Sequence, residues 1–353
     1  MGPIVRDGPA ACLRRAGARR ARTVRAVEPT AAGSVDLTPQ LEEVAPGVYS
    51  YVQPDGTWFV NNAGFVVGDE SVVAVDATST ERRTRAYLDA IASVTDLPVG
   101  VLVNTHHHAD HTHGNFLFDD AVVVSHRACR DAMVAAGIPD YGAVFPGVDW
   151  GELTFRAPDV TFETGLTLHA GSLGTVELAH VGFVAHTAGD VLAWVPQRGV
   201  LFAGDLVFHG GTPFVLFGSV SGTLAALDLV QGYDADVVVP GHGPTFGRGD
   251  VARVLDGQRD YLRFVQDGAA AGLAAGRSPL EQARATDLGE FARLTDSERL
   301  AANLHVAYRE AGGDEGGAAG GAGGGAAGPA SLVEQGIADM VAYNGGALPR
   351  CVA

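Results

Sequence analysis

The sequence of 353 residues contains no lysine: all 24 of its basic residues are arginines. This absence excludes a Schiff-base enzyme and a nucleotide-binding phosphate loop, because both need a lysine amine. No apolar run approaches the roughly 18 residues of a membrane span, so we expect no integral membrane protein. The three cysteines, Cys12, Cys129 and Cys351, lie far apart. Their spacing excludes a Cys-x-x-Cys zinc site and predicts a reducing, cytoplasmic location without disulfides.

The composition is that of a globular, acidic chain. Hydrophobic residues make up 46% and charged residues 18%, which excludes global disorder. The formal net charge is −17, although residues 1–28 hold seven arginines against two acidic residues. The rest of the chain is therefore strongly acidic and is expected to repel nucleic acid.

Composition and periodicity divide the chain into four parts. Residues 1–40 predict a disordered, Arg-rich tail or a start codon assigned too early, since no apolar segment follows the arginine pairs. Residues 41–310 alternate β-rich runs with amphipathic stretches and predict the catalytic domain. Residues 311–330, with ten glycines and seven alanines, predict a flexible linker. Residues 331–353 predict an amphipathic helix that docks back on the domain.

Five histidines fall within eight residues, at the end of the apolar run 100–103. The motif is His-x-His-x-Asp-His. His106 and His108, two apart in an extended chain, point the same way and can share one metal. Asp110 and His111 follow a turn and can reach a second metal. Imidazole and carboxylate without thiolate favour zinc, iron or manganese.

Three further segments complete a ligand set. His186 precedes a predicted strand, Asp205 ends the run Leu201–Gly204, and His242 lies on a glycine-rich turn after the run Val237–Val239. Because each lies at a strand end, where loops gather, we expect all of them in one site. A solvated polyhistidine stretch is the alternative, and this complete set argues against it.

These ordered motifs resemble the metallo-β-lactamase superfamily. The resemblance implies an α/β fold, an αββα sandwich with helical C-terminal additions, and two Zn²⁺ ions at its sheet edges. Asp76 matches the superfamily's first motif, and the resemblance implies that it orients ligands without binding metal. The implied ligands are His106, His108 and His186 for the first ion, Asp110, His111 and His242 for the second, and Asp205 as the bridge.

Four segments are similar to a narrower family, the cyclase/thioesterases of bacterial aromatic (type II) polyketide pathways that close the second ring of actinorhodin-type products. They are Val48–Gln53, Gly211–Val220, Asp260–Gln266 and Val341–Pro349. The resemblance implies an enzyme that closes an aldol ring and hydrolyses a polyketide thioester from an acyl carrier protein. Asp110 and Asp205 are then the catalytic carboxylates, with a metal-bound hydroxide. The segment Val181–His186 is one residue longer than in that family.

Six residues are predicted to contact substrate. Three are aromatic residues, which suit a flat substrate. One is a histidine four residues after Asp205, where the chain is expected to border the pocket, and two belong to the C-terminal segment, which is expected to face substrate. The six residues are Trp58, His209, Phe214, Phe217, Tyr343 and Asn344.

Several alternatives remain open at this point. A generic hydrolase of thioesters or lactones, similar to glyoxalase II, needs the same two metals. An iron persulfide dioxygenase shares the His-x-His-x-Asp-His motif but binds one iron. A non-catalytic scaffold is disfavoured because every ligand position is filled. The expected partner is the carrier-bound thioester, with neither nucleic acid nor a membrane, and the chain is expected as a monomer or a homodimer.

Overall fold

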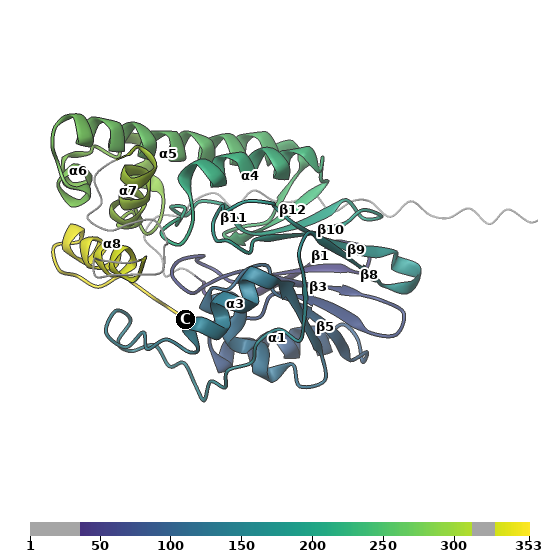
Figure 1. Cartoon of the computed structure of the whole chain (residues 1–353). Helices are drawn as coiled ribbons and strands as arrows, with labels where there is room; N and C mark the ends of the chain where they lie inside the picture. The colour runs from purple at the N-terminus through teal and green to yellow at the C-terminus, as the bar shows by residue number, and fades with distance from the viewer. Residues whose placement is uncertain (1–35, 313–328) are drawn as a thin grey trace, which may run out of the picture. The chain divides into compact units, whose positions relative to one another are not determined.

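The computed structural model describes residues 36–312 and 329–353. Most of the predicted Arg-rich tail and of the predicted linker lies outside these residues. Within them, two β-sheets pack face to face and helices cover both outer faces (Figure 1). The αββα arrangement expected from the sequence is thereby confirmed.

The first sheet contains seven strands among the described residues, and its order follows the chain. Strands β4 to β7 run parallel to one another, whereas β1 to β4 pair antiparallel. Its strands are β1 (Gln40–Ala45), β2 (Val48–Val52), β3 (Ala63–Val67), β4 (Val72–Val75), β5 (Val99–Val103), β6 (Val122–His126) and β7 (Val160–Phe162).

The second sheet contains six strands in the described part of the chain, in the order β13-β12-β11-β10-β9-β8. All nine residues of β11 are buried, because helices cover one face of this sheet and the first sheet covers the other. Its strands are β8 (Gly165–His169), β9 (Thr175–His180), β10 (Val191–Val195), β11 (Val200–Phe208), β12 (Val237–His242) and β13 (Phe246–Gly247).

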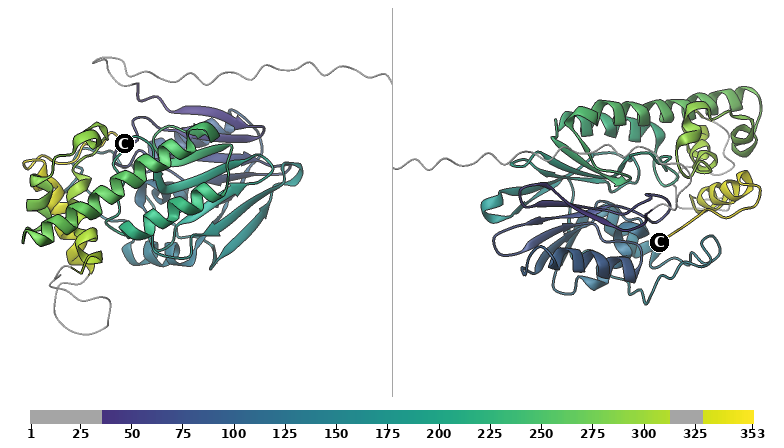
Figure 2. Two further views of the ribbon diagram at one scale, coloured as in Figure 1. Left: turned by 90° about the horizontal axis from the view of Figure 1, so that it is seen from above. Right: turned by 180° about the vertical axis from the view of Figure 1, so that it is seen from behind.

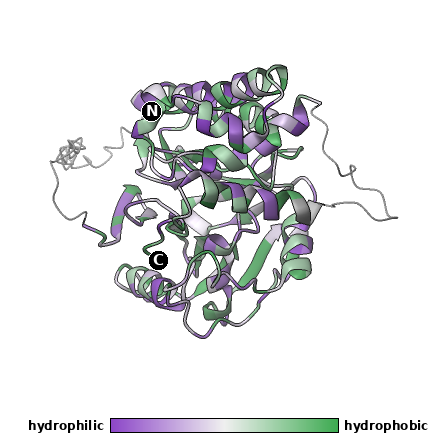
Figure 3. Ribbon diagram, turned by 90° about the vertical axis from the view of Figure 1, so that its left-hand side faces the viewer, coloured by the Kyte–Doolittle hydropathy of each residue, from purple (hydrophilic) through white to green (hydrophobic). Residues whose placement is uncertain are grey.

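Two pairs of helices form the outer layers. Helices α1 (Glu81–Ala92) and α3 (Arg127–Ala136) lie on the first sheet, and α4 (Val220–Gly232) and α5 (Arg248–Ala274) lie side by side across the second (Figure 2). Hydrophilic and hydrophobic residues alternate along the helices (Figure 3), as expected when only one face of each helix is buried. Helix α5 has 27 residues.

Among the described residues, three α-helices follow α5 at one end of the sandwich: α6 (Pro279–Ala285), α7 (Arg299–Glu310) and α8 (Pro329–Tyr343). Helix α8 packs on α7, and His305 Nε2 donates to Asp339 Oδ2 at 2.8 Å. A Cβ at Gly336 would lie 2.7 Å from Leu216 Cδ1, so α8 approaches the domain closely at this glycine. No helix of the described ranges is long and apolar enough to cross a membrane.

The connections that follow β4, β5, β11 and β12 determine where the polar residues gather. These strands run parallel within their sheets, so their carboxyl ends meet at one edge of the sandwich. The predicted ligands of the first sheet follow β5, and His242 ends β12. Asp205 lies within β11, and His186 lies in the connection from β9 to β10. The short helix α2 (Ala109–Thr112) and the 3₁₀ turn His113–Leu117 complete the connection after β5.

Candidate metal centre

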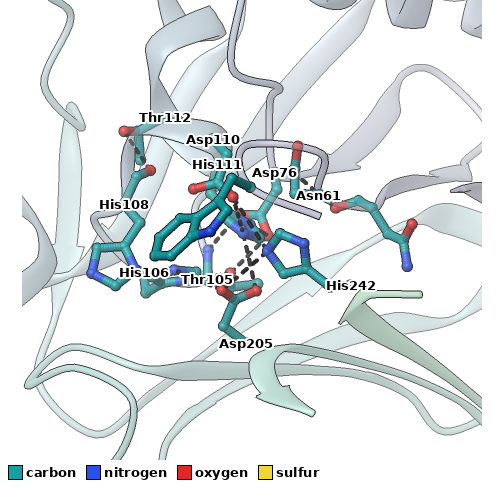
Figure 4. A network of polar contacts seen from close by, with 12 residues as sticks. Asn61, Asp76, Thr105, His106, His108, Asp110, His111, Thr112, Asp205 and His242 are labelled. Carbon is teal, nitrogen blue, oxygen red and sulfur yellow. Dashed lines mark hydrogen bonds and ion pairs between the residues drawn. The ribbon is translucent and has the colours of Figure 1, made fainter. Parts of the chain in front are cut away.

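Asp76, directly after β4, is hydrogen-bonded to the histidine cluster (Figure 4). Its Oδ1 accepts from the Thr105 backbone N–H at 2.7 Å, and its Oδ2 accepts from Thr105 Oγ1 at 2.7 Å. His111 Nδ1 donates to the same Oδ2 at 2.8 Å. Asp76 is buried and adopts a positive φ of 59°, which lets its carboxylate reach across to the loop after β5. Its carboxylate therefore contacts both the backbone before His106 and the ring of His111.

The structure brings the seven predicted ligands together in two groups. In each group, one potential ligand atom from every residue lies within 4.8 Å of the others. The first group is His106, His108, His186 and Asp205, and the second is Asp110, His111, Asp205 and His242. Asp205 belongs to both, which is the arrangement that a bridging carboxylate requires.

Backbone and hydroxyl oxygens fix how the imidazoles are turned. His186 Nδ1 donates to the Phe214 carbonyl at 2.7 Å, and His242 Nδ1 donates to the Gly56 carbonyl at 3.1 Å. His106 Nδ1 lies 3.1 Å from Thr105 Oγ1. Each of these rings therefore presents Nε2 to the cluster, as metal-binding histidines do when an oxygen holds the other ring nitrogen.

Several ligand atoms are buried without a hydrogen-bond partner among the described residues: His106 Nε2, His111 Nε2 and Asp205 Oδ1. Buried polar atoms are normally paired, and leaving one unpaired costs about 1–3 kcal/mol. Metal ions would satisfy all three atoms. The donor set, imidazoles and carboxylates only, fits zinc.

Burial and charge adjust the protonation states of the two groups. Burial lowers the pKa of His186 to about 4, so its ring is neutral near pH 7. Burial alone would raise the pKa of Asp205, but the imidazoles of His242, His111 and His106 hold it well below its usual range. Burial also opposes the charge on His242, yet the carboxylates raise its pKa to about 9. A metal bound by His242 must therefore displace a proton.

Glycines let the strand ends approach one another at the cluster. A Cβ at Gly241 would collide with Asp205 Oδ1. Asn62 Nδ2 donates to the carbonyls of Pro240 and Gly243, at 2.9 and 2.6 Å, and so holds the turn that carries His242. The sequence analysis did not single out Asn62, because an asparagine in a loop gives no signal of a partner 178 residues away.

A cavity of about 120 Å³ opens beside the cluster, with His108, Asp110, Asp205 and His242 in its wall. The other walls are mostly aromatic. The predicted Trp58, Phe214 and Phe217 line it, as do residues that sequence reasoning missed: Phe59, Tyr141, Phe145, Phe208, Arg299, Ile337 and Met340.

Three of the residues predicted to contact substrate, His209, Tyr343 and Asn344, lie outside this cavity lining. Neighbouring residues of an extended chain face opposite ways, so Phe208 faces the cavity while His209 turns to the Pro244 carbonyl, at 2.8 Å from Nδ1. Helix α8 reaches the cavity with Ile337 and Met340. Tyr343 ends the helix beyond the cavity and packs on the apolar core, and Asn344 begins the following turn.

Comparison with known proteins gives both a sequence and a structural match. Residues 56–242 match the sequence model of the Metallo-beta-lactamase superfamily. The linear primary-alkylsulfatase of Pseudomonas sp. (strain ATCC 19151) is 24% identical over 253 residues, which cover 60% of this chain but only 47% of that enzyme. The acyl-coenzyme A thioesterase MBLAC2 of Homo sapiens is 28% identical over 210 residues, 53% of this chain and 74% of that one.

Solved structures also share the fold, and two of them illustrate the likeness. The metallo-beta-lactamase from Pontibacter korlensis is 23% identical, with a TM-score of 0.53, covering 64% of this chain and 99% of its own. TMB-1 is 17% identical with a TM-score of 0.51, covering 64% and 97%. At these identities the likeness concerns the fold alone.

Proposed function

The chain belongs to the metallo-beta-lactamase superfamily, and we propose that it is a zinc-dependent thioesterase and cyclase of an aromatic polyketide intermediate. The single observation that carries the proposal is the position of the two ligand groups. They share Asp205 and border a cavity whose remaining walls are mainly aromatic. Such a cavity suits a flat acyl group whose thioester end reaches the metals.

Two zinc ions would be held by the two groups, where they would polarise a carbonyl and lower the pKa of a bound water. This chain's own residues do the positioning. Asp76 holds the His111 ring, and the Phe214 and Gly56 carbonyls hold the rings of His186 and His242. Asp110 lines the cavity, where its carboxylate could accept a proton from the attacking water, and its Oδ2 lies 3.2 Å from His242 Nε2.

Hydrolysis of a thioester and closure of an aldol ring have one electrostatic demand in common. Both develop negative charge on an oxygen next to the reacting carbon, so one site can serve both steps. The aromatic side chains around the cavity exclude water from the acyl group. The exclusion of water favours ring closure within the polyketide acyl group before the thioester is hydrolysed.

The polyketide assignment is supported by segments that border the cavity. Residues 211–220, similar in the cyclase family, supply Phe214 and Phe217 to the wall. The similar segment Val341–Pro349 follows the part of α8 that supplies Ile337 and Met340. We propose a cytoplasmic enzyme whose partner is an acyl carrier protein, with a homodimer as the alternative to a monomer.

A general acyl-thioesterase is the second candidate, and the likeness to MBLAC2 favours it. It would use the same metals but would not close a ring. An iron persulfide dioxygenase is disfavoured, because a single iron would leave the ligands of the second group without a metal.

The test combines metal analysis with assays of thioesters on two carriers, an acyl carrier protein and coenzyme A. We expect about two zinc ions per chain, and we expect hydrolysis of an aromatic acyl thioester from an acyl carrier protein with release of a cyclised product. Asp205→Ala removes the shared ligand, so both zinc content and turnover should collapse. Full activity with one metal would contradict the dinuclear site. Equal hydrolysis from coenzyme A, without ring closure, would favour the general thioesterase.

A further inference from the structure

One wall of the aromatic cavity comes from helix α8. Its residues Ile337 and Met340 line the cavity together with four of the predicted metal ligands. Helix α8 lies at the end of the sandwich beside α6 and α7 (Figures 1 and 2), whereas the ligand groups lie at the edge where the two sheets meet. The cavity therefore extends outward from the ligands to α8.

Exposure distinguishes the mouth of the cavity from its closed end. Phe217 lines the cavity and is 41% exposed, so the cavity opens to solvent beside it. The Phe217 ring lies 4.9 Å from the ring of His108, so the ligands are close to this mouth. Met340 is only 2% exposed and belongs to the hydrophobic core. An acyl group whose thioester lies at the ligands therefore extends inward and ends against Met340.

Contacts on three sides fix the position of α8. Asp339 Oδ2 accepts from His305 Nε2 of α7 at 2.8 Å, and a backbone carbonyl of α8 accepts from Arg284 Nη2 of α6 at 2.7 Å. On a third side, a Cβ at Gly336 would lie 2.7 Å from Leu216 Cδ1. The helix is therefore packed against the domain, and its cavity wall cannot retreat without the loss of these contacts.

The volume of the cavity limits what fits between the ligands and α8. The cavity measures about 120 Å³. An apolar cavity of roughly 150 Å³ binds benzene, whereas pockets for drug-sized ligands measure about 300–1,000 Å³. A single ring, or an open chain of similar volume, therefore fits, and a second fused ring would overlap the wall that Met340 forms.

We infer that Met340 is a specificity-determining residue that limits the acyl group to about the size of one six-membered ring. This inference rests on the proposed thioesterase function. The limit is imposed by a helix outside residues 56–242, the part of the chain that matches the superfamily. Met340→Ala removes three heavy atoms at the closed end of the cavity and leaves the predicted ligands in place, so it should admit a larger group.

The experiment measures binding, so its result does not depend on turnover. Isothermal titration calorimetry on the zinc-loaded full chain compares two uncleavable thioethers of N-acetylcysteamine, the S-benzyl and the S-(2-naphthylmethyl) compounds. We expect the wild type to bind the benzyl compound at least about tenfold more tightly. Met340→Ala should reduce this preference about tenfold or more, whereas Met340→Leu, which conserves volume, should retain it. Met133→Ala, buried in α3 and outside the cavity lining, is the matched control and should also retain it.

Three outcomes would overturn the inference: equal wild-type affinity for the two compounds, no binding of either, or an equal change of both affinities in Met340→Ala. If the alanine variant does not fold, Met340→Val takes its place with the same expectation. Hydrolysis of the S-benzoyl ester of N-acetylcysteamine tests the proposed function separately. A size preference in binding without any hydrolysis would support the limit set by Met340 and show that the proposed thioesterase function is wrong.

Discussion

Asp76 shows how much of the site depends on a residue that is not itself a predicted ligand. It accepts three hydrogen bonds, two from Thr105 and one from His111. Each fixes a part of the loop between β5 and α2. The carboxylate is buried, so its partners would be left unpaired without it.

Asp76→Asn should weaken zinc binding by about 10- to 100-fold, because an amide cannot accept at both former oxygens. Asparagine tolerates the positive φ, so the backbone is not the cause of any loss. Zinc affinity is measured by competition with a chelator. Asp69→Asn is the matched control, since Asp69 likewise accepts from the N–H and Oγ of one residue, Ser172, but on the exposed surface. Equal zinc affinity of Asp76→Asn and wild type would contradict the positioning role.

At the level of secondary-structure elements, a pair of stacked histidine rings connects β6 of the first sheet with β9 of the second. The rings of His126 and His180 lie 3.7 Å apart and nearly parallel. His126 Nδ1 accepts from the Ala128 N–H, and His180 Nδ1 accepts from the Gly182 N–H. Each Nε2 donates to a carbonyl, of Glu163 and Ala188 respectively. A proton on His126 Nδ1 would remove the acceptor of the Ala128 N–H.

This contact predicts a loss of stability at mildly acidic pH. Burial, with the neighbouring His180, lowers the pKa of His126 in the folded state. The unfolded chain, with a histidine pKa of about 6.5, therefore takes up the proton first as the pH falls. The contribution of neutral His126 to the stability of the folded chain is therefore complete above about pH 6.5 and is lost as the pH falls below that value.

His126→Asn should make the free energy of unfolding depend less on pH between about 7.5 and 5. Asparagine keeps an acceptor for the Ala128 N–H at the start of α3 but cannot titrate. Urea unfolding at several pH values measures the slope. His169→Asn, on the exposed part of β8, is the control. An unchanged slope in His126→Asn would show that the pKa of His126 does not differ between the folded and unfolded chain.

In the molecule as a whole, the two halves of the sandwich each supply part of the candidate metal centre. The connection after β5 carries His106, His108, Asp110 and His111, while His186, Asp205 and His242 come from the second half. The cluster therefore lies where the two sheets meet. Metal bound there would join the sheets as well as supply the chemistry.

Chelation of the metal should therefore lower the melting temperature. A ligand that binds only the folded state at 1,000 times its Kd stabilises it by about 4 kcal/mol. Differential scanning calorimetry with and without a chelator, and after zinc is restored, measures the effect. Asp205→Ala should show little of this shift. An unchanged melting temperature after verified metal removal would mean that the cluster does not couple metal binding to folding.

The sequence by itself determined the elements and the ligand types. Apolar runs such as 72–75 and 237–239 become buried strands because they can be buried on both faces, and polar residues at their ends can lie only at a sheet edge. The spacing of His106 and His108 likewise depends only on local geometry. Periodicity and strand-end chemistry are properties of short segments, so they can be read without the rest of the chain.

Only the tertiary structure decided the cavity. Trp58, Arg299 and Met340 come from segments far apart in the chain, and no local pattern marks them as neighbours. The distance of His209 from Asp205 along the sequence predicts a position beside the pocket, but strand β11 runs on to Phe208 and His209 faces the Pro244 carbonyl. Which side chains share a cavity depends on strand phase and helix packing. These are set by the contacts of the whole core rather than by neighbours in sequence.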